Sequence, residues 1–128
     1  MGSGTSIGRV RGLGSAKEGA HHWWRQRVTA ASNLFLTLWF VFSLLRLPGY
    51  DYASVHDWLR NSWVAVPMIL LIVSVFYHFR LGLQVVIEDY QHGETRIVLM
   101  LLLNAFVFIA AGTGIFSVLR IAFTGAAA

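Results

Sequence analysis

Residues 77–93 combine a long apolar run with the ionisable side chains best suited to chemistry. His78 lies inside the run, Gly82 follows four residues later, and the pair Asp89-Tyr90 closes it. A neutral imidazole is a strong axial ligand for haem iron, and a phenol beside a carboxylate can donate a hydrogen bond or help relay a proton. Ionisable groups are costly inside a bilayer, so this stretch predicts a functional site.

Helical geometry arranges these side chains as two sites on one stripe. His78 and Asp89 are eleven residues apart, close to three turns, so they point in nearly the same direction. They lie roughly 16 Å apart along the axis. Gly82, one turn after His78, would let a flat macrocycle approach the backbone. Two plainer alternatives stay open: His78 could donate to a neighbouring helix, and Asp89-Tyr90 could be an ordinary helix end.

Three apolar segments could hold these side chains in a membrane. They span residues 28–47, 63–87 and 97–119, and each reaches the roughly 20 residues that a transmembrane helix needs. Apolar residues make up 56% of the 128-residue chain and charged residues 12%, which is not the composition of a soluble domain. We predict an all-α membrane protein, with a flexible cytoplasmic tail over residues 1–19 and a three-helix anchor over residues 20–128.

The composition also excludes several kinds of redox centre. The chain has no cysteine, which rules out disulfides, thiolate metal sites and cysteine-held iron–sulfur clusters within it. It has no glycine fingerprint for a nucleotide, so flavin or iron–sulfur chemistry would have to reside on a partner. The net charge of +4 comes with basic residues clustered at the N-terminus, which suits topology setting better than nucleic-acid binding.

The basic residues orient the segments. Five precede the first segment, whereas the loop after it holds only Arg60. The positive-inside rule therefore predicts a cytoplasmic N-terminus and a periplasmic C-terminus. The start of the first segment and the loop over residues 88–96 then share one cytoplasmic surface. The residues predicted to lie at that surface include His21, His22, Arg27, Asp89, Tyr90 and His92.

Other polar residues are expected to have structural roles. Between the first two segments, a short interfacial helix is expected, with Ser54 as a possible cap. Arg80 should face away from His78 and snorkel or pair. Asn104 is typical of a hydrogen bond between helices, and Thr29, near the start of the first segment, should face protein or a cofactor instead of lipid.

The order of these residues resembles the D-type membrane-anchor subunit of succinate dehydrogenase, respiratory complex II. The resemblance covers roughly residues 20–119, and the three-segment plan with its N-terminus inside is also the family's. The matching residues are His78, Gly82, Asp89-Tyr90 and His92-Gly93, preceded by His21 and by Arg27-Val28-Thr29-Ala30. The chain lacks the Ser-Pro-His and His-Arg-x-Thr-Gly signatures of the companion C-type subunit.

The resemblance implies a role for each matching position. His78 would be one axial ligand of haem b, with the second histidine on the C-type cytochrome b subunit. Tyr90 would hydrogen-bond a ubiquinone carbonyl, and Asp89 would support it. The residues implied near the haem and its propionates are Arg27, His21, His22 and Gly82.

The implied protein is not a catalyst alone. It would be a multi-pass anchor of succinate:ubiquinone oxidoreductase in the bacterial inner membrane, completed by the C-type subunit and docking the iron–sulfur and flavoprotein subunits. Two alternatives remain: an anchor of a quinol:fumarate reductase, which runs the reverse reaction, and a non-redox membrane adaptor in which His78 only packs.

Overall fold

The chain folds into helices connected by short turns. The computed structural model describes Ser6 and residues 16–124, and the rest of the predicted tail lies outside the described residues. The elements are α2 (Ala16–Leu45), α3 (Tyr52–Arg60), α4 (Ser62–Tyr90) and α5 (Gly93–Thr124). No strand occurs among the described residues, which confirms the all-α prediction. Because α2 begins at Ala16, the last part of the predicted tail is helical.

Three of these helices are long and apolar enough to cross a membrane, as predicted. They are Gly19–Leu45 within α2, all of α4 and all of α5. The 29 residues of α4 correspond to a length of about 43 Å, more than the roughly 30 Å of a hydrocarbon core. The helices extend past the apolar runs because polar side chains can be solvated at the interface while the backbone stays helical.

The turn between α4 and α5 is shorter than predicted. The loop expected over residues 88–96 is wrong, since α4 continues to Tyr90 and α5 begins at Gly93. Gly93 has a φ of 62°, in the left-handed region that glycine adopts without strain. An ion pair between Glu88 Oε1 and Arg96 Nη2, at 3.4 Å, joins the two helix ends. Asp89 and Tyr90 therefore lie in the last turn of α4.

The short helix α3 was predicted, but its cap was not. Asp51, not Ser54, is the N-cap, and its carboxylate accepts hydrogen bonds from Ser54 Oγ at 2.7 Å and from Ser54 N at 3.3 Å. These bonds hold the pKa of the Asp51 carboxyl below its ordinary value. Trp58 anchors α3 to α2, because its Nε1 donates to Ser43 Oγ at 2.8 Å and its ring stacks on Trp39.

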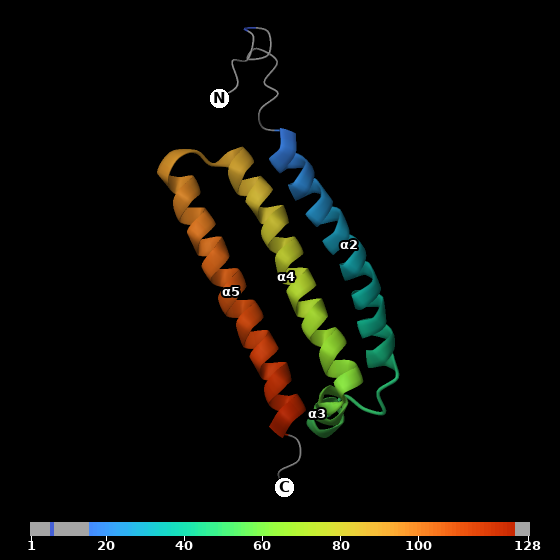
Figure 1. The fold of residues 1–128 in the computed structure, drawn as a ribbon. Helices are drawn as coiled ribbons and strands as arrows, with labels where there is room; N and C mark the ends of the chain where they lie inside the picture. Colours follow the sequence, from blue (N-terminus) through green and yellow to red (C-terminus); the bar gives the residue numbers. More distant parts are fainter. Residues whose placement is uncertain (1–5, 7–15, 125–128) are drawn as a thin grey trace.

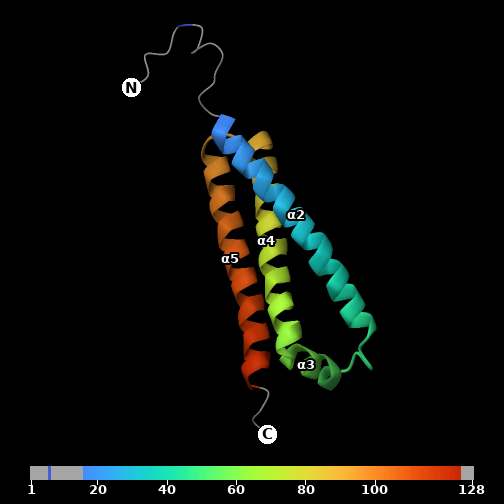
Figure 2. The same cartoon turned by 45° about the vertical axis from the view of Figure 1, so that its right-hand side comes forward.

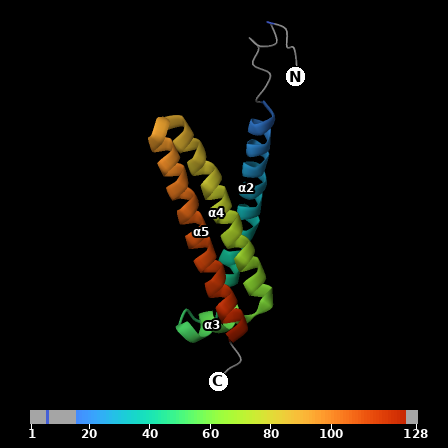
Figure 3. The ribbon, with the colours of Figure 1, turned by 60° about the vertical axis from the view of Figure 1, so that its left-hand side comes forward.

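α4 is the central helix of the fold. Within the described residues, α2 and α5 each pack on α4 and not on each other (Figures 1 and 3). A buried hydrophobic cluster of Ile87, Leu103 and Val107 lies between α4 and α5. Many large apolar side chains stay exposed, among them Phe35 at 71% and Phe108 at 74%. Such surface must face lipid or other chains.

The helix order places the residues predicted for the cytoplasmic surface at one end. The N-terminal end of α2 and the turn between α4 and α5 lie together, whereas α3 and the C-terminal end of α5 lie at the opposite end (Figures 1 and 2). The helices thus run alternately, and the start of α2 shares an end with Asp89 and Tyr90, as the topology argument predicted.

Candidate functional site

His78 contacts α2 through one of its two ring nitrogens. Its Nδ1 atom lies 3.0 Å from Thr29 Oγ1, and the side chain is partly buried. Nε2 forms no hydrogen bond with any residue in the part of the chain that the structure describes. The contact with a neighbouring helix is thus real, but it uses only Nδ1. The other nitrogen is left able to act as a donor, an acceptor or a metal ligand.

A second polar contact holds Thr29 against α4 one turn away. Ser74 is buried, and its Oγ donates to the carbonyl oxygen of Thr29 at 3.4 Å. Ser74 and His78 are four residues apart, so both project from the same face of α4. Thr29 therefore meets protein instead of lipid, as its place in a polar turn predicted.

Thr29, Ser74 and His78 mark a line of contact between α2 and α4, called the seam below, and Gly82 lies further along it. A Cβ atom built at Gly82 would lie 3.9 Å from Gln26 Nε2, an ordinary contact distance. The packing within this chain therefore does not require a glycine at this position. The close approach of a flat group at this position remains a prediction.

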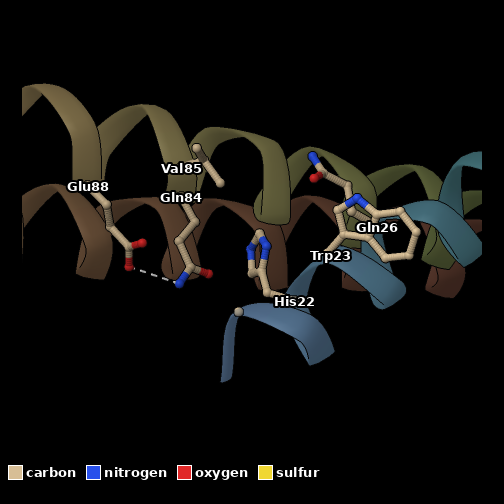
Figure 4. A pocket seen from close by; sticks show the side chains of 7 residues that line it. His22, Trp23, Gln26, Gln84, Val85 and Glu88 are labelled. Carbon is tan, nitrogen blue, oxygen red and sulfur yellow. Dashed lines mark hydrogen bonds between the residues drawn. The ribbon is translucent and has the colours of Figure 1, made fainter. Parts of the chain in front are cut away.

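A cleft of about 430 Å³ opens between α2 and α4 near the N-terminal end of α2 (Figure 4). Its lining residues are Gly19, His22, Trp23, Gln26, Gln84, Val85 and Glu88. His22 points from α2 toward α4, and its Nε2 atom is buried with no hydrogen-bond partner among the described residues. A buried polar atom left unpaired costs about 1–3 kcal/mol, so its partner is expected to come from outside the described residues.

Three lining residues with amide or carboxylate side chains, Gln26, Gln84 and Glu88, were not predicted for the site from the sequence. Gln84 Nε2 donates to Glu88 Oε1 at 3.0 Å, a bond drawn in Figure 4. The spacing of four residues between them was the available signal, because side chains at that spacing share a helix face. Gln26 lies four residues after His22 and could have been placed beside it for the same reason.

Arg27 and His21 do not enter the cleft. The Arg27 guanidinium carbon lies 5.2 Å from the centroid of the Trp23 ring, a cation–π contact within α2. Both Arg27 and His21 are exposed. Of the predicted propionate-side residues, the structure brings only His22 and Gly82 to the seam between α2 and α4.

Asp89 and Tyr90 face outward from the end of α4. Both are exposed, Tyr90 at 78%, and neither side chain bonds to another described residue. The phenol hydroxyl and the carboxylate are therefore free to meet a group that approaches from outside. No three His, Cys, Asp or Glu side chains gather closely enough to hold a metal ion anywhere in residues 16–124. His78 could thus contribute one ligand to a shared centre, not a complete ligand set.

Arg80 lies on the α5 side of α4, away from His78. Its Nε donates to Asn104 Oδ1 of α5 at 2.6 Å. This bond confirms both predictions, that Arg80 pairs on a different face and that Asn104 links two helices. A guanidinium within a membrane-spanning helix needs such acceptors, because lipid offers none.

We expect Asn104→Leu to destabilise the packing of α4 on α5 by about 1.5 kcal/mol, since it leaves Arg80 without its acceptor. Unfolding of the purified subunit in mixed micelles, followed by circular dichroism, measures this. The double variant Arg80→Met/Asn104→Leu should recover most of the loss, because neither polar group is then left alone. Equal destabilisation in the single and double variants would contradict the pairing.

Taken together, three membrane-crossing helices and a largely uncovered apolar surface define an integral membrane anchor chain. The chain belongs to the succinate dehydrogenase/fumarate reductase transmembrane subunit family, whose model it matches over residues 1–112. It is 36% identical to the succinate dehydrogenase hydrophobic membrane anchor subunit of Rickettsia bellii, over 66% of this chain and 67% of that protein.

Two further relatives carry the same description. The hydrophobic membrane anchor subunit of Rickettsia conorii is 31% identical over 80% of this chain and 83% of its own length. That of Paracoccus denitrificans is 31% identical over 68% of this chain and 67% of its own length. These similarities confirm the resemblance to the succinate dehydrogenase anchor subunit, and with it a multi-pass protein of the bacterial inner membrane.

Proposed function

We propose that this subunit supplies one axial ligand of haem b and part of the ubiquinone-reduction site of a succinate:ubiquinone oxidoreductase. The observation that carries the proposal is the state of His78. Its ring is held through Nδ1 by a residue of α2, while Nε2 stays unbonded within a membrane-crossing helix. A histidine fixed at one nitrogen and free at the other is the arrangement in which protein histidines bind metals.

The residues along the seam between α2 and α4 fit half of a haem site. His78 would bind the iron through Nε2, and Gly82 leaves the backbone open one turn away. The unpaired Nε2 of His22 could donate to a propionate, with His21 and Arg27 near the same helix end. Haem b, when bound, would supply a one-electron store within the membrane. The second axial histidine would come from the C-type subunit.

Tyr90 and Asp89 would form this chain's part of the ubiquinone site. The exposed Tyr90 hydroxyl has no partner among the described residues and can donate to a quinone carbonyl. Asp89, its exposed neighbour, would orient the phenol or relay protons from the cytoplasm. Conversion of ubiquinone to ubiquinol takes up two electrons and two protons, so electrons from the iron–sulfur subunit must meet protons here.

The remaining surfaces would serve assembly. With the N-terminus cytoplasmic and the C-terminus periplasmic, the end that carries Asp89 and Tyr90 faces the cytoplasm and would dock the iron–sulfur and flavoprotein subunits. The exposed apolar flanks would pack against the C-type subunit and lipid. The chain would therefore take part in an enzyme without being a catalyst alone.

The direction of the reaction distinguishes the nearest alternative. The family description covers both succinate dehydrogenase and fumarate reductase, and the relatives named above are succinate dehydrogenase subunits. Those names favour succinate oxidation over an anchor of quinol:fumarate reductase. A non-redox adaptor would require neither a free ligand nitrogen in α4 nor a partner that carries haem.

Purification of the tagged chain from native membranes tests the proposal. We expect a flavoprotein, an iron–sulfur protein and a second membrane subunit to co-purify, with a reduced haem b band in the visible spectrum. The complex should also reduce ubiquinone with succinate faster than it reduces fumarate with a quinol. Recovery of the assembled partners without a haem b band would contradict the haem proposal, and recovery without redox partners would favour the adaptor.

A further inference from the structure

We infer that Thr29 is a positioning residue for His78, fixing the tautomer in which Nδ1 carries the proton and Nε2 carries the lone pair. This inference rests on the proposed role of His78 as a haem ligand and adds a residue on α2 that sets the properties of the ligand. It identifies what holds the imidazole in a state that can bind iron.

The argument begins with the single proton of the Thr29 hydroxyl. Thr29 Oγ1 lies 2.9 Å from the Arg25 carbonyl oxygen, 3.1 Å from the Gln26 carbonyl oxygen and 3.0 Å from His78 Nδ1. Carbonyl oxygens only accept, so the hydroxyl proton satisfies its own helix. The remaining contact then needs a proton on Nδ1. If Nδ1 were unprotonated, the Thr29 hydroxyl would have to donate its proton to Nδ1. The carbonyl oxygens of Arg25 and Gln26 would then face a lone pair of Thr29 Oγ1.

The accepting oxygen, Thr29 Oγ1, is also held rigidly. Threonine is restricted at χ1 by its branched Cβ, and the bonds to the carbonyls of the preceding turn select one rotamer. Ser74 donates to the Thr29 carbonyl oxygen at 3.4 Å, which ties the backbone at this point to α4. The ring of His78 is therefore oriented by a fixed oxygen on a neighbouring helix.

A hydrogen bond donated by the far ring nitrogen makes an imidazole a more basic ligand. A more basic ligand stabilises the ferric state relative to the ferrous state, and so lowers the midpoint potential of the bound haem. The Thr29 hydroxyl is thus expected to tune the potential and not only to seat the ring.

The test compares three variants of the assembled complex. Thr29→Val keeps the branched shape but removes the hydroxyl, Thr29→Ser keeps the hydroxyl, and Ser74→Ala removes the other bond to Thr29 without touching the ring. Potentiometric titration of the haem b band and the electron paramagnetic resonance spectrum of the ferric haem give the readout. We expect a raised potential and shifted g-values in Thr29→Val, values near wild type in Thr29→Ser, and a smaller shift in Ser74→Ala, because Ser74 holds the Thr29 backbone but does not contact the ring.

Wild-type values in Thr29→Val would overturn the inference, and so would an equal shift in Ser74→Ala, which would point to loosened helices. If Thr29→Val does not assemble, redox-induced infrared difference spectra of the unaltered complex with ¹⁵N-histidine decide the matter. A ring mode of a protonated, hydrogen-bonded Nδ1 supports the inference, and one of an unprotonated or unbonded Nδ1 overturns it. A haem band that survives in His78→Ala would contradict the proposed ligand itself, which separates the two failures.

Discussion

In the assembled complex, His78→Ala is expected to abolish the reduced haem b band. Alanine removes the only imidazole in α4, whose ring is held through Nδ1 by Thr29. A haem left with one axial ligand, or lost altogether, cannot give the spectrum of a haem held by two histidines. Visible difference spectra of purified complex, normalised to the flavoprotein subunit, measure the effect.

His56→Ala provides a matched control for this substitution. His56 lies in α3, at the opposite end of the fold from Asp89 and Tyr90, where it packs beside the Tyr52 ring. The same change of residue type there should leave the haem b band at wild-type intensity. An unchanged band in His78→Ala would show that His78 only packs between α2 and α4.

Tyr90→Phe is expected to slow succinate-driven ubiquinone reduction by about tenfold or more, the effect of losing one hydrogen bond of roughly 1.4 kcal/mol to the reacting quinone. The variant keeps the ring, so the end of α4 should be unaffected. The assay compares a ubiquinone analogue with a water-soluble acceptor that takes electrons from the soluble subunits directly. Only the rate with the ubiquinone analogue should fall.

Tyr77→Phe is the matched control for Tyr90→Phe. Tyr77 lies on the same helix, beside an apolar groove between α4 and α5, far from the helix end. Its loss of a hydroxyl should change neither rate. Normal turnover and normal quinone affinity in Tyr90→Phe would exclude its hydroxyl from the quinone site, whereas a fall in both rates would indicate a defect of assembly.

Because Tyr90 is exposed, a quinone pocket at this position would be completed by other subunits. The Tyr90 side chain is 78% exposed, and a quinone held there would need walls from other subunits. The proposed haem site is incomplete in the same way, because His78 offers one ligand and this chain forms one side of the site. Both proposed sites are thus halves, and their tests must be made on the assembled complex.

The helices could be predicted from the sequence because the bilayer leaves few choices. A segment of about 20 apolar residues in lipid must satisfy its backbone hydrogen bonds internally, so it becomes a helix. The helix ends were less certain, since charged residues mark an interface and not necessarily a loop. Glu88 was assigned to a loop, but its side chain bonds to Gln84 and Arg96 and α4 continues to Tyr90.

The sequence by itself determined the chemical types and their spacing: an imidazole in an apolar helix, a glycine one turn on, and Asp-Tyr at the helix end. Only the tertiary structure decided which side chains meet. Thr29 and His78 are 49 residues apart, and the packing of α2 on α4 selects this pair. His21 and His22 are adjacent in sequence, yet only His22 enters the cleft. A sequence sets the relative directions of side chains on a helix, but helix packing decides which direction faces a neighbour.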